Sequence, residues 1–301
     1  MTDSQDPGGS GGVSDSGATV QSGATLAIAG VTGALGGMVS RALAEAGVSQ
    51  RMLARTPSKA PALPGATVVE FDYADRSACE TALSGVETLF FVSGREDEHR
   101  LSHHRALVDA AAAAGVRHVV YTSFVGASPT STFTLGRDHY ATEQFIEASG
   151  VAYTFLRDNF YQDLLPYFVG DDGILRGPAG HGRAAFVARA DVARVATAVL
   201  QDPGAHAGRT YDLTGPEALT LYEVATLLTT GLRRSVSYVD ETVPEAYASR
   251  AHYGAPDWQV DAWVSTYTAI RAGELEGISD DIETITGRRA TNLAQLLTGA
   301  G

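Results

Sequence analysis

Three residues of this chain have side chains that could serve proton transfer: Ser123, His139 and Tyr140. Ser123 follows a predicted strand over residues 118–122, and the other two lie on a predicted helix over residues 136–149. An imidazole titrates near neutral pH and a phenol at about pH 10, so either could donate a hydrogen bond to an oxygen that gains charge. We predict all three as catalytic candidates. A surface histidine and a serine that caps the following loop are the plainer alternatives.

The chain lacks a lysine that could activate Tyr140. Lys59 is the only lysine, and Gln144 stands four residues after Tyr140. Without a nearby ammonium group to favour the phenolate, Tyr140 can donate a hydrogen bond but is poorly activated as a general acid or base at neutral pH. The choice of proton donor therefore stays open between His139 and Tyr140, with Ser123 assisting.

A glycine-rich stretch near the start of the chain predicts a phosphate site. Gly30, Gly33 and Gly36 follow an apolar strand and open a predicted helix over residues 35–46. Gly30 permits a tight turn, Gly33 lets backbone amides approach a pyrophosphate, and Gly36 lets the helix pack against the sheet with its N-terminus towards the phosphates. The alternative is a glycine-lined turn with a structural role only.

Two cations follow the second predicted strand, residues 50–54, where dinucleotide folds recognise the adenosine ribose. An acidic residue there would bind a free 2′-hydroxyl, whereas this chain has Arg55 with Lys59 nearby. Their charge favours a 2′-phosphate, so we predict NADP(H) as the cofactor. The alternative is that both are solvated loop cations.

Strands and helices alternate along the first half of the chain. Further strands are predicted over residues 66–71, 87–92, 118–122 and 152–156, with helices over 100–114 and 136–149. This rhythm predicts an α/β fold with a Rossmann-type doubly wound parallel sheet and a ligand crevice at the carboxyl ends of the strands. Ser93, Ser123 and Arg157 end strands and should meet in that crevice.

The chain divides by composition into three predicted parts. Residues 1–23 are rich in Gly and Ser and are predicted to be disordered. Residues 24–157 form the predicted NADP(H)-binding Rossmann domain. Residues 158–301, where the rhythm loosens, form a smaller mixed α/β substrate-binding lobe packed on it, and this part includes predicted strands over 210–213 and 235–239 and helices over 159–168, 191–200 and 221–232.

Aromatic residues gather near the end of the chain. An apolar stripe at helical spacing, which includes Trp263 and Tyr267, is predicted to be the core face of a helix, with an aromatic wall over a flat substrate as the alternative. Trp258, Tyr253 and Tyr247 lie off that stripe. They are better candidates for a pocket or an interface, and Trp258 is predicted to bind substrate.

Composition excludes several classes of function. The chain has 301 residues, 44% of them hydrophobic, and a formal net charge of -13, which argues against a nucleic-acid surface. No stretch is long enough to span a membrane, no secretory signal is evident, and the single cysteine, Cys79, excludes an intramolecular disulfide. We expect a cytoplasmic protein with a small-molecule substrate. His103, His104 and Asp109 lack further clustered ligands, so no metal site is predicted; a homodimer is the candidate assembly.

Several motifs together resemble the NmrA-like atypical short-chain dehydrogenases, in particular their NADPH:quinone oxidoreductase 2 branch. They extend over about residues 24–296. The motifs are Gly30-Val31-Thr32-Gly33-Ala34-Leu35-Gly36, Arg55-Thr56-Pro57-Ser58-Lys59-Ala60, Asp72-Tyr73, Tyr121-Thr122-Ser123, His139-x-x-x-Glu143, Leu156-Arg157-x-Asn159-Phe160-Tyr161 and Ile285-Thr286-Gly287-Arg288-Arg289.

The resemblance implies NADP(H) binding without the usual Tyr and Lys pair. It implies a reductase of a conjugated carbonyl or quinone-like acceptor, a tailoring reductase of secondary metabolism, or a regulator that senses NADP(H) without turnover. Residue by residue, it implies that Thr32, Gly33, Ala34 and Leu35 bind the pyrophosphate, Arg55 and Lys59 the 2′-phosphate, Ser93 and Ser123 the ribose and nicotinamide, and Asn159 and Tyr161 the substrate. Asp72, Tyr73 and Gly94, which close predicted strands, complete the predicted cofactor site with Gly30 and Gly36.

Overall fold

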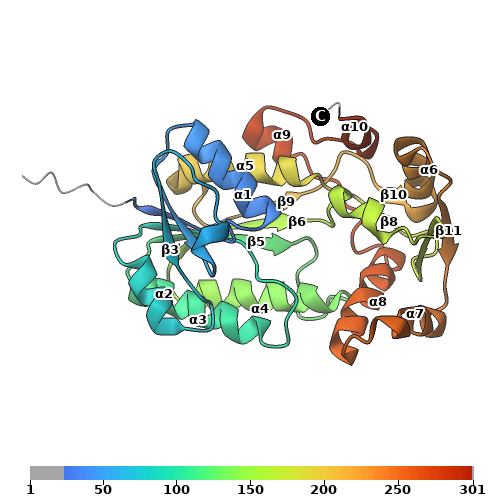
Figure 1. The fold of residues 1–301 in the computed structure, drawn as a ribbon, viewed down its shortest axis with the longest axis horizontal. Helices are drawn as coiled ribbons and strands as arrows, with labels where there is room; N and C mark the ends of the chain where they lie inside the picture. The colour runs from blue at the N-terminus through green and yellow to red at the C-terminus, as the bar shows by residue number, and fades with distance from the viewer. Residues whose placement is uncertain (1–23, 300–301) are drawn as a thin grey trace, which may run out of the picture.

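Seven short strands, most of them rich in apolar residues, pair into one parallel sheet. The structure is a computed structural model that describes residues 24–299, so the disorder predicted for residues 1–23 lies outside the described part. The order across the sheet is β3-β2-β1-β4-β5-β6-β9 (Figure 1). The strands are β1 Leu26–Ala29, β2 Gln50–Ala54, β3 Ala66–Glu70, β4 Thr88–Phe91, β5 His118–Phe124, β6 Ala152–Asp158 and β9 Arg209–Leu213.

Helices cover both faces of this sheet, because its strands carry apolar side chains on both sides. Ile28 and Val120 belong to the core under one set of helices, whereas Ala27 and Val119, their neighbours in sequence, belong to the core under the other. The first set is α1 Ala34–Glu45, α5 Arg189–Gln201 and α9 Asp281–Thr286, and the second is α2 Arg76–Leu83, α3 Arg100–Ala113 and α4 Thr134–Ala148. The predicted doubly wound Rossmann-type sheet is confirmed.

A lobe with its own apolar core lies beside the carboxyl ends of the strands (Figure 1). We use "lobe" for segments 162–184, 219–271 and 293–298. Its strands pair in twos, β7 with β11 in parallel and β8 with β10 antiparallel. Its elements are the 3₁₀ helix η2 Gln162–Phe168, β7 Ile174–Gly177, β8 Arg183–Ala184, β10 Leu219–Thr220, α6 Leu221–Leu232, β11 Ser237–Asp240, α7 Val243–Arg250, the 3₁₀ helix η4 Ala251–Tyr253, α8 Asp257–Arg271 and α10 Leu293–Thr298. Two more 3₁₀ helices, η1 Pro57–Lys59 and η3 Pro203–His206, lie in loops of the sheet region.

Some elements beyond residue 157 differ from those predicted. The strand predicted over 210–213 joins the main sheet as β9, next to β6, because Tyr211 and Leu213 point into the same core as α1 and α5. The helix predicted over 159–168 is shorter, a 3₁₀ helix that starts at Gln162. Thr220 caps α6 through a hydrogen bond from the Glu223 amide. The division into domains at residue 157 stays a prediction.

None of the helices within residues 24–299 is both long enough and apolar enough to cross a membrane.

Gly36 is where α1 approaches the end of β1 most closely. A Cβ atom at Gly36 would lie 2.4 Å from the carbonyl oxygen of Gly30. Gly36→Ala should therefore lower the free energy of unfolding by about 1–3 kcal/mol through overpacking, as measured by urea denaturation. The control is Gly277→Ala, where a Cβ meets nothing within 4 Å and the change should stay within about 0.5 kcal/mol. Equal losses in the two variants would contradict the close approach.

Candidate functional site

A cavity of about 410 Å³ opens where the order of the sheet reverses, between the carboxyl ends of β1 and β4. In doubly wound sheets this switch point is where ligands bind. Most of the predicted cofactor residues line it: Gly30, Thr32, Gly33, Arg55, Lys59, Asp72, Tyr73, Ser93 and Gly94. The fold therefore brings residues from the loops after β1, β2, β3 and β4 to one cleft, which we call the cofactor cleft.

The N-terminus of α1 is suited to an anion. Gly33 is its N-cap residue and offers no side chain, and the first turn of the helix contains no acidic residue, so its amide groups are left for a ligand. Gly30 takes a left-handed φ of 75°, which turns the chain from β1 into this helix.

Cations gather in the cofactor cleft although the whole chain carries a net charge of -13. Arg55 and Lys59 are exposed at the end of β2 and line the cleft, as a role with a 2′-phosphate requires. Arg95 and Arg100 line it from the segment after β4. These four cations exceed the two carboxylates of the lining, Asp72 and Asp97, so the cleft is positive on balance although the whole chain is acidic.

The other predicted cofactor residues lie outside the lining of this cleft. Leu35 is buried in the core beneath α1, and Gly36 is packed against the Gly30 carbonyl, so both support the turn rather than line the cavity. Ala34 is exposed on the first turn of α1. Ser123 is only 1% exposed and donates a hydrogen bond to Oε1 of Glu143 at 2.6 Å.

His139 is buried below the cleft and both of its ring nitrogens have partners. Nη2 of Arg100 lies 3.0 Å from Nε2, and Oη of Tyr121 lies 3.0 Å from Nδ1. Because a guanidinium can only donate, Nε2 is unprotonated and the neutral ring carries its hydrogen on Nδ1. Burial, followed by the charge of Arg100, holds the pKa of His139 well below its usual value. In this arrangement His139 has no free proton to offer.

The remaining catalytic candidate, Tyr140, is half-buried on α4, and it lines neither the cofactor cleft nor the lobe cavity described below. Glu143, one turn further on, binds Arg157 at 2.6 Å and receives the Ser123 hydroxyl. These polar side chains therefore bind each other beneath the strand ends. The structure does not bring Ser123, His139 and Tyr140 together at one ligand surface.

The predicted substrate residues form structural contacts. The amide of Asn159, 1% exposed, donates to the Leu275 carbonyl at 3.0 Å and so ties β6 to the segment after α8. Tyr161 donates to Oδ2 of Asp158 at 2.6 Å and lies under the guanidinium of Arg189. Trp258 is half-buried at the start of α8 and lies outside the wall of both the cofactor cleft and the lobe cavity.

A second cavity, of about 640 Å³, lies in the lobe between η2, β7, η4 and α8; we call it the lobe cavity. Its wall holds five aromatic side chains: Tyr167, Phe168, Tyr253, Trp263 and Tyr267. Tyr167 is 82% exposed and Tyr253 64%, which are unusually high values for large apolar side chains that share one hollow. Exposed aromatic groups around a cavity indicate a binding surface for a flat ligand.

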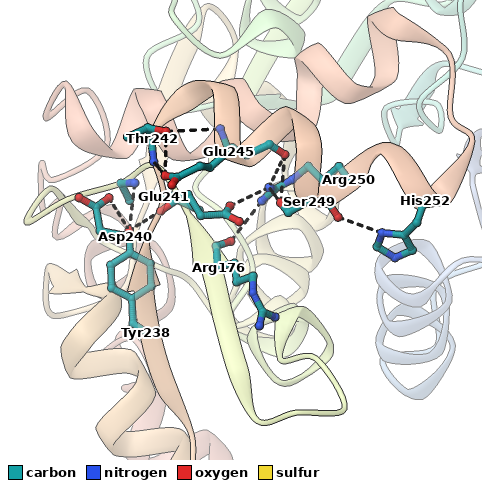
Figure 2. Close-up of polar contacts among 12 residues, drawn as sticks. Arg176, Tyr238, Asp240, Glu241, Thr242, Glu245, Ser249, Arg250 and His252 are labelled. Atoms are coloured by element: carbon teal, nitrogen blue, oxygen red, sulfur yellow. Dashed lines mark hydrogen bonds and ion pairs between the residues drawn. The ribbon is translucent and has the colours of Figure 1, made fainter.

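Arg250, which lines the lobe cavity, forms a buried ion pair with Glu241 (Figure 2). Arg250 donates to Glu241 at 3.0 Å, to the carbonyl of Ala246 at 2.9 Å and to that of Arg176 at 3.1 Å. Its guanidinium also lies over the ring of Tyr267, 5.1 Å from the centroid. Through these contacts Arg250 connects α7 to β7 and to the Tyr267 ring on α8.

Trp263, in the wall of the lobe cavity, contacts the segment that borders the cofactor cleft. Nε1 of Trp263 donates to the carboxylate of Glu96 at 3.3 Å. Glu96 lies between Arg95 and Asp97, which line the cofactor cleft. Trp263 and Tyr267, which were predicted to belong to the core face of a helix, line the lobe cavity, whereas Val264 and Ile270 of the same helix are buried.

Arg100 and His104 line the cofactor cleft, although sequence reasoning considered His104 only as a metal ligand and gave Arg100 no role. A signal was present, since the two are four residues apart and so share a face of α3, and Arg100 occupies a first turn where acidic residues are preferred. Both ring nitrogens of His104 form hydrogen bonds, Nε2 with the Gly94 amide and Nδ1 with Thr142, so neither is left to bind a metal. Within residues 24–299, no group of three or more His, Cys, Asp or Glu side chains could hold a metal ion.

Comparison with known proteins gives consistent matches. Residues 22–293 match the model of the NmrA-like family. Quinone oxidoreductase 2 of Escherichia coli is 34% identical over 279 residues, which cover 90% of this chain and 96% of that protein. The NAD(P)H azoreductase of Xenophilus azovorans is 32% identical over 275 residues, with coverage of 90% and 96%.

Solved structures agree with these matches. The crystal structure of the NADPH-dependent quinone oxidoreductase from Escherichia coli complexed with NADPH has a TM-score of 0.83 at 33% identity, covering 91% of this chain and 99% of that one. Triphenylmethane reductase of Citrobacter sp., complexed with NADP(H), has a TM-score of 0.81 at 29% identity, covering 92% and 100%.

Asp158, which accepts the Tyr161 hydroxyl, should make stability depend on pH. Burial raises its pKa to about 7, well above the value of about 3.9 in an unfolded chain. Between these values the native state keeps a proton that the unfolded state has lost. The carboxyl therefore costs about 1.4 kcal/mol of stability per unit of rising pH, until pH passes about 7.

Asp158→Asn removes this titration while keeping an oxygen for Tyr161. Its free energy of unfolding should improve relative to the parent chain as pH rises from 4.5 to 7, and then stay level up to about pH 8. Urea denaturation at each pH measures the difference. A difference that is the same at every pH would contradict the raised pKa.

Proposed function

This chain belongs to the NmrA-like family, and on that premise we propose that it is an NADPH-dependent oxidoreductase that reduces a small conjugated carbonyl or quinone-like acceptor. The single observation that carries the proposal is the cofactor cleft, which joins an uncapped helix N-terminus to Arg55 and Lys59 at the switch point of the sheet. The relatives named above are a quinone oxidoreductase, an azoreductase and a triphenylmethane reductase, all of them reductases.

The residues of the cofactor cleft fit NADPH. Thr32 and Gly33 would hold the pyrophosphate at the N-terminus of α1, and Arg55 and Lys59 would hold the 2′-phosphate through charge-assisted hydrogen bonds. Ser93 and Gly94 would border the nicotinamide end. A bound NADPH would supply a hydride for the acceptor.

We propose the lobe cavity as the acceptor site. Its aromatic walls favour a flat conjugated ring system, and Trp263 joins it to the segment that borders the cofactor cleft. His139 and Ser123, the two catalytic candidates that are most deeply buried, would have an indirect role. His139 would hold Arg100 in place, and Ser123 would hold Glu143. The proton that completes the reduction would then come from water or from Tyr140.

A homodimer and a cytoplasmic location stay predictions. The alternative function, a regulator that senses NADP(H) without turnover, would use the cofactor cleft but not the lobe cavity. The aromatic lining of that cavity is the observation that favours turnover. Among reductases, one that tailors secondary metabolites would accept few members of an acceptor panel, and a general quinone reductase would accept many.

The purified chain should consume NADPH with a naphthoquinone, and the lobe cavity should determine the KM for that acceptor. Tyr253→Ala should raise this KM about tenfold, because a stacking ring is lost, while the KM for NADPH stays the same. Tyr222→Ala is the matched control, since Tyr222 is also exposed but lies outside the cavity lining. Tyr140→Phe separates the two proton sources, because kcat falls only if Tyr140 is the donor.

Tight NADPH binding without consumption across quinones, enones and imines would reject the reductase and favour the regulator.

Arg55 should decide which cofactor is used. Arg55→Asp removes a charge-assisted contact of roughly 1.5–3 kcal/mol and places a carboxylate where it can bind a free 2′-hydroxyl. The preference for NADPH over NADH should therefore fall by about one to two orders of magnitude, measured as the ratio of kcat/KM values. Arg234→Asp changes the charge equally at an exposed position outside the cofactor cleft and should leave the ratio as it is. An unchanged ratio in Arg55→Asp would contradict the 2′-phosphate role.

A further inference from the structure

We propose that His104 and Arg100 are positioning residues that together fix the peptide groups of Gly94 at the wall of the cofactor cleft. This inference rests on the proposed binding of NADPH in that cleft. It assigns a role to two α3 residues that neither the glycine-rich turn nor the 2′-phosphate site explains.

Side chains, not secondary structure, hold the short segment after β4. The Gly94 amide donates to Nε2 of His104 at 2.9 Å, and the Gly94 carbonyl accepts from Nε of Arg100 at 3.1 Å. One residue earlier, the Ser93 amide donates to Oγ1 of Thr122 at 2.8 Å. The three side chains are at most 4% exposed, and each bond is part-buried at the edge of the cleft.

The contacts of His104 allow only one arrangement of protons. A backbone amide can only donate, so Nε2 of His104 must be unprotonated and the neutral ring must carry its hydrogen on Nδ1. Nδ1 then donates to Oγ1 of Thr142 at 2.9 Å, and the Thr142 hydroxyl donates to the Asp138 carbonyl at 2.8 Å. Every donor in this series of hydrogen bonds has an acceptor, and the series extends from Gly94 in the cofactor cleft to Asp138 on α4.

Arg100 connects the same peptide segment to α4 by a second route. Its Nη1 lies 3.3 Å from the carboxylate of Asp138, and its Nη2 lies 3.0 Å from His139. The guanidinium is 4% exposed and has acceptors on two elements. Both routes end on α4, so α3 and α4 together hold Gly94.

Gly94 needs such restraint because it has no side chain of its own to fix its conformation. If His104 stops accepting, the Gly94 amide loses its hydrogen-bond partner, and the peptide can rotate towards the cleft. A rotated peptide would change the wall that NADPH meets. We therefore expect His104 to affect cofactor affinity although it does no chemistry itself.

Substitutions at His104 can separate its hydrogen bonds from its volume. In His104→Gln, Oε1 can accept from Gly94 and Nε2 can donate to Thr142, so the Kd for NADPH should stay within about threefold of the parent value. His104→Leu fills the space without an acceptor, and its Kd should rise about tenfold, equivalent to about 1.4 kcal/mol. NADPH fluorescence titration of the full chain measures the Kd directly, without turnover.

Thr142→Val tests the same hydrogen bonds and disturbs the core less than His104→Leu does. It removes the acceptor of Nδ1, which frees His104 to carry its hydrogen on Nε2, where it can no longer accept from Gly94. We expect its Kd for NADPH to rise at least threefold, with the KM for the acceptor unchanged.

The matched control is His118, another buried histidine bonded to a threonine, 2.9 Å from Thr154, on β5 and outside the cleft lining. His118→Leu should lower the unfolding midpoint but leave the Kd for NADPH unchanged. The proposal is overturned if His104→Leu and Thr142→Val bind NADPH like the parent chain, or if His104→Gln binds as weakly as His104→Leu. If the parent chain itself does not bind NADPH, the proposed function fails instead.

Discussion

The cofactor cleft depends on how closely α1 approaches the end of β1. A side chain at Gly36 would collide with the Gly30 carbonyl, and a Cβ at Gly30 would lie 3.0 Å from Cβ of Val92 at the end of β4. With both positions free of side chains, the first turn of the helix comes down onto the two strands that border the switch point. The unpaired amides of the helix, the cations after β2 and the segment after β4 then face the same space.

Much of the fold could be predicted from the sequence because its signals are local. Gln50–Ala54 and Leu221–Leu232 were predicted with the bounds that the structure has, and most other predicted strands and helices of the sheet region differ by one to three residues. The helix Arg76–Leu83, between β3 and β4, was missed because its apolar stripe spans little more than two turns. The position of β9 in the sheet could not be predicted, since the sequence of a five-residue strand does not indicate which strand it pairs with.

Part of the candidate site could also be predicted from the sequence. Gly30, Arg55 and Ser93 follow from where strands end, and strand ends meet at one edge of a parallel sheet. The resemblance to the NmrA-like family is confirmed by the family match. By contrast, His139 was predicted as a candidate proton donor, because its place on a helix does not disclose that Arg100, 39 residues earlier, occupies its Nε2. The roles of the individual site residues stay predictions.

The route of the chain between sheet and lobe has a mechanical consequence. After β6 the chain enters the lobe and returns to the sheet as α5 and β9. It enters the lobe again at β10 and stays there to α8, covers the sheet with α9 and returns to the lobe with α10 (Figure 1). No single cut of the backbone would release the lobe, and a swing of the lobe would have to bend several connections at once. We therefore expect the two parts to melt in one cooperative step, and the lobe cavity to admit ligands by side-chain rotation and small shear rather than by hinge opening.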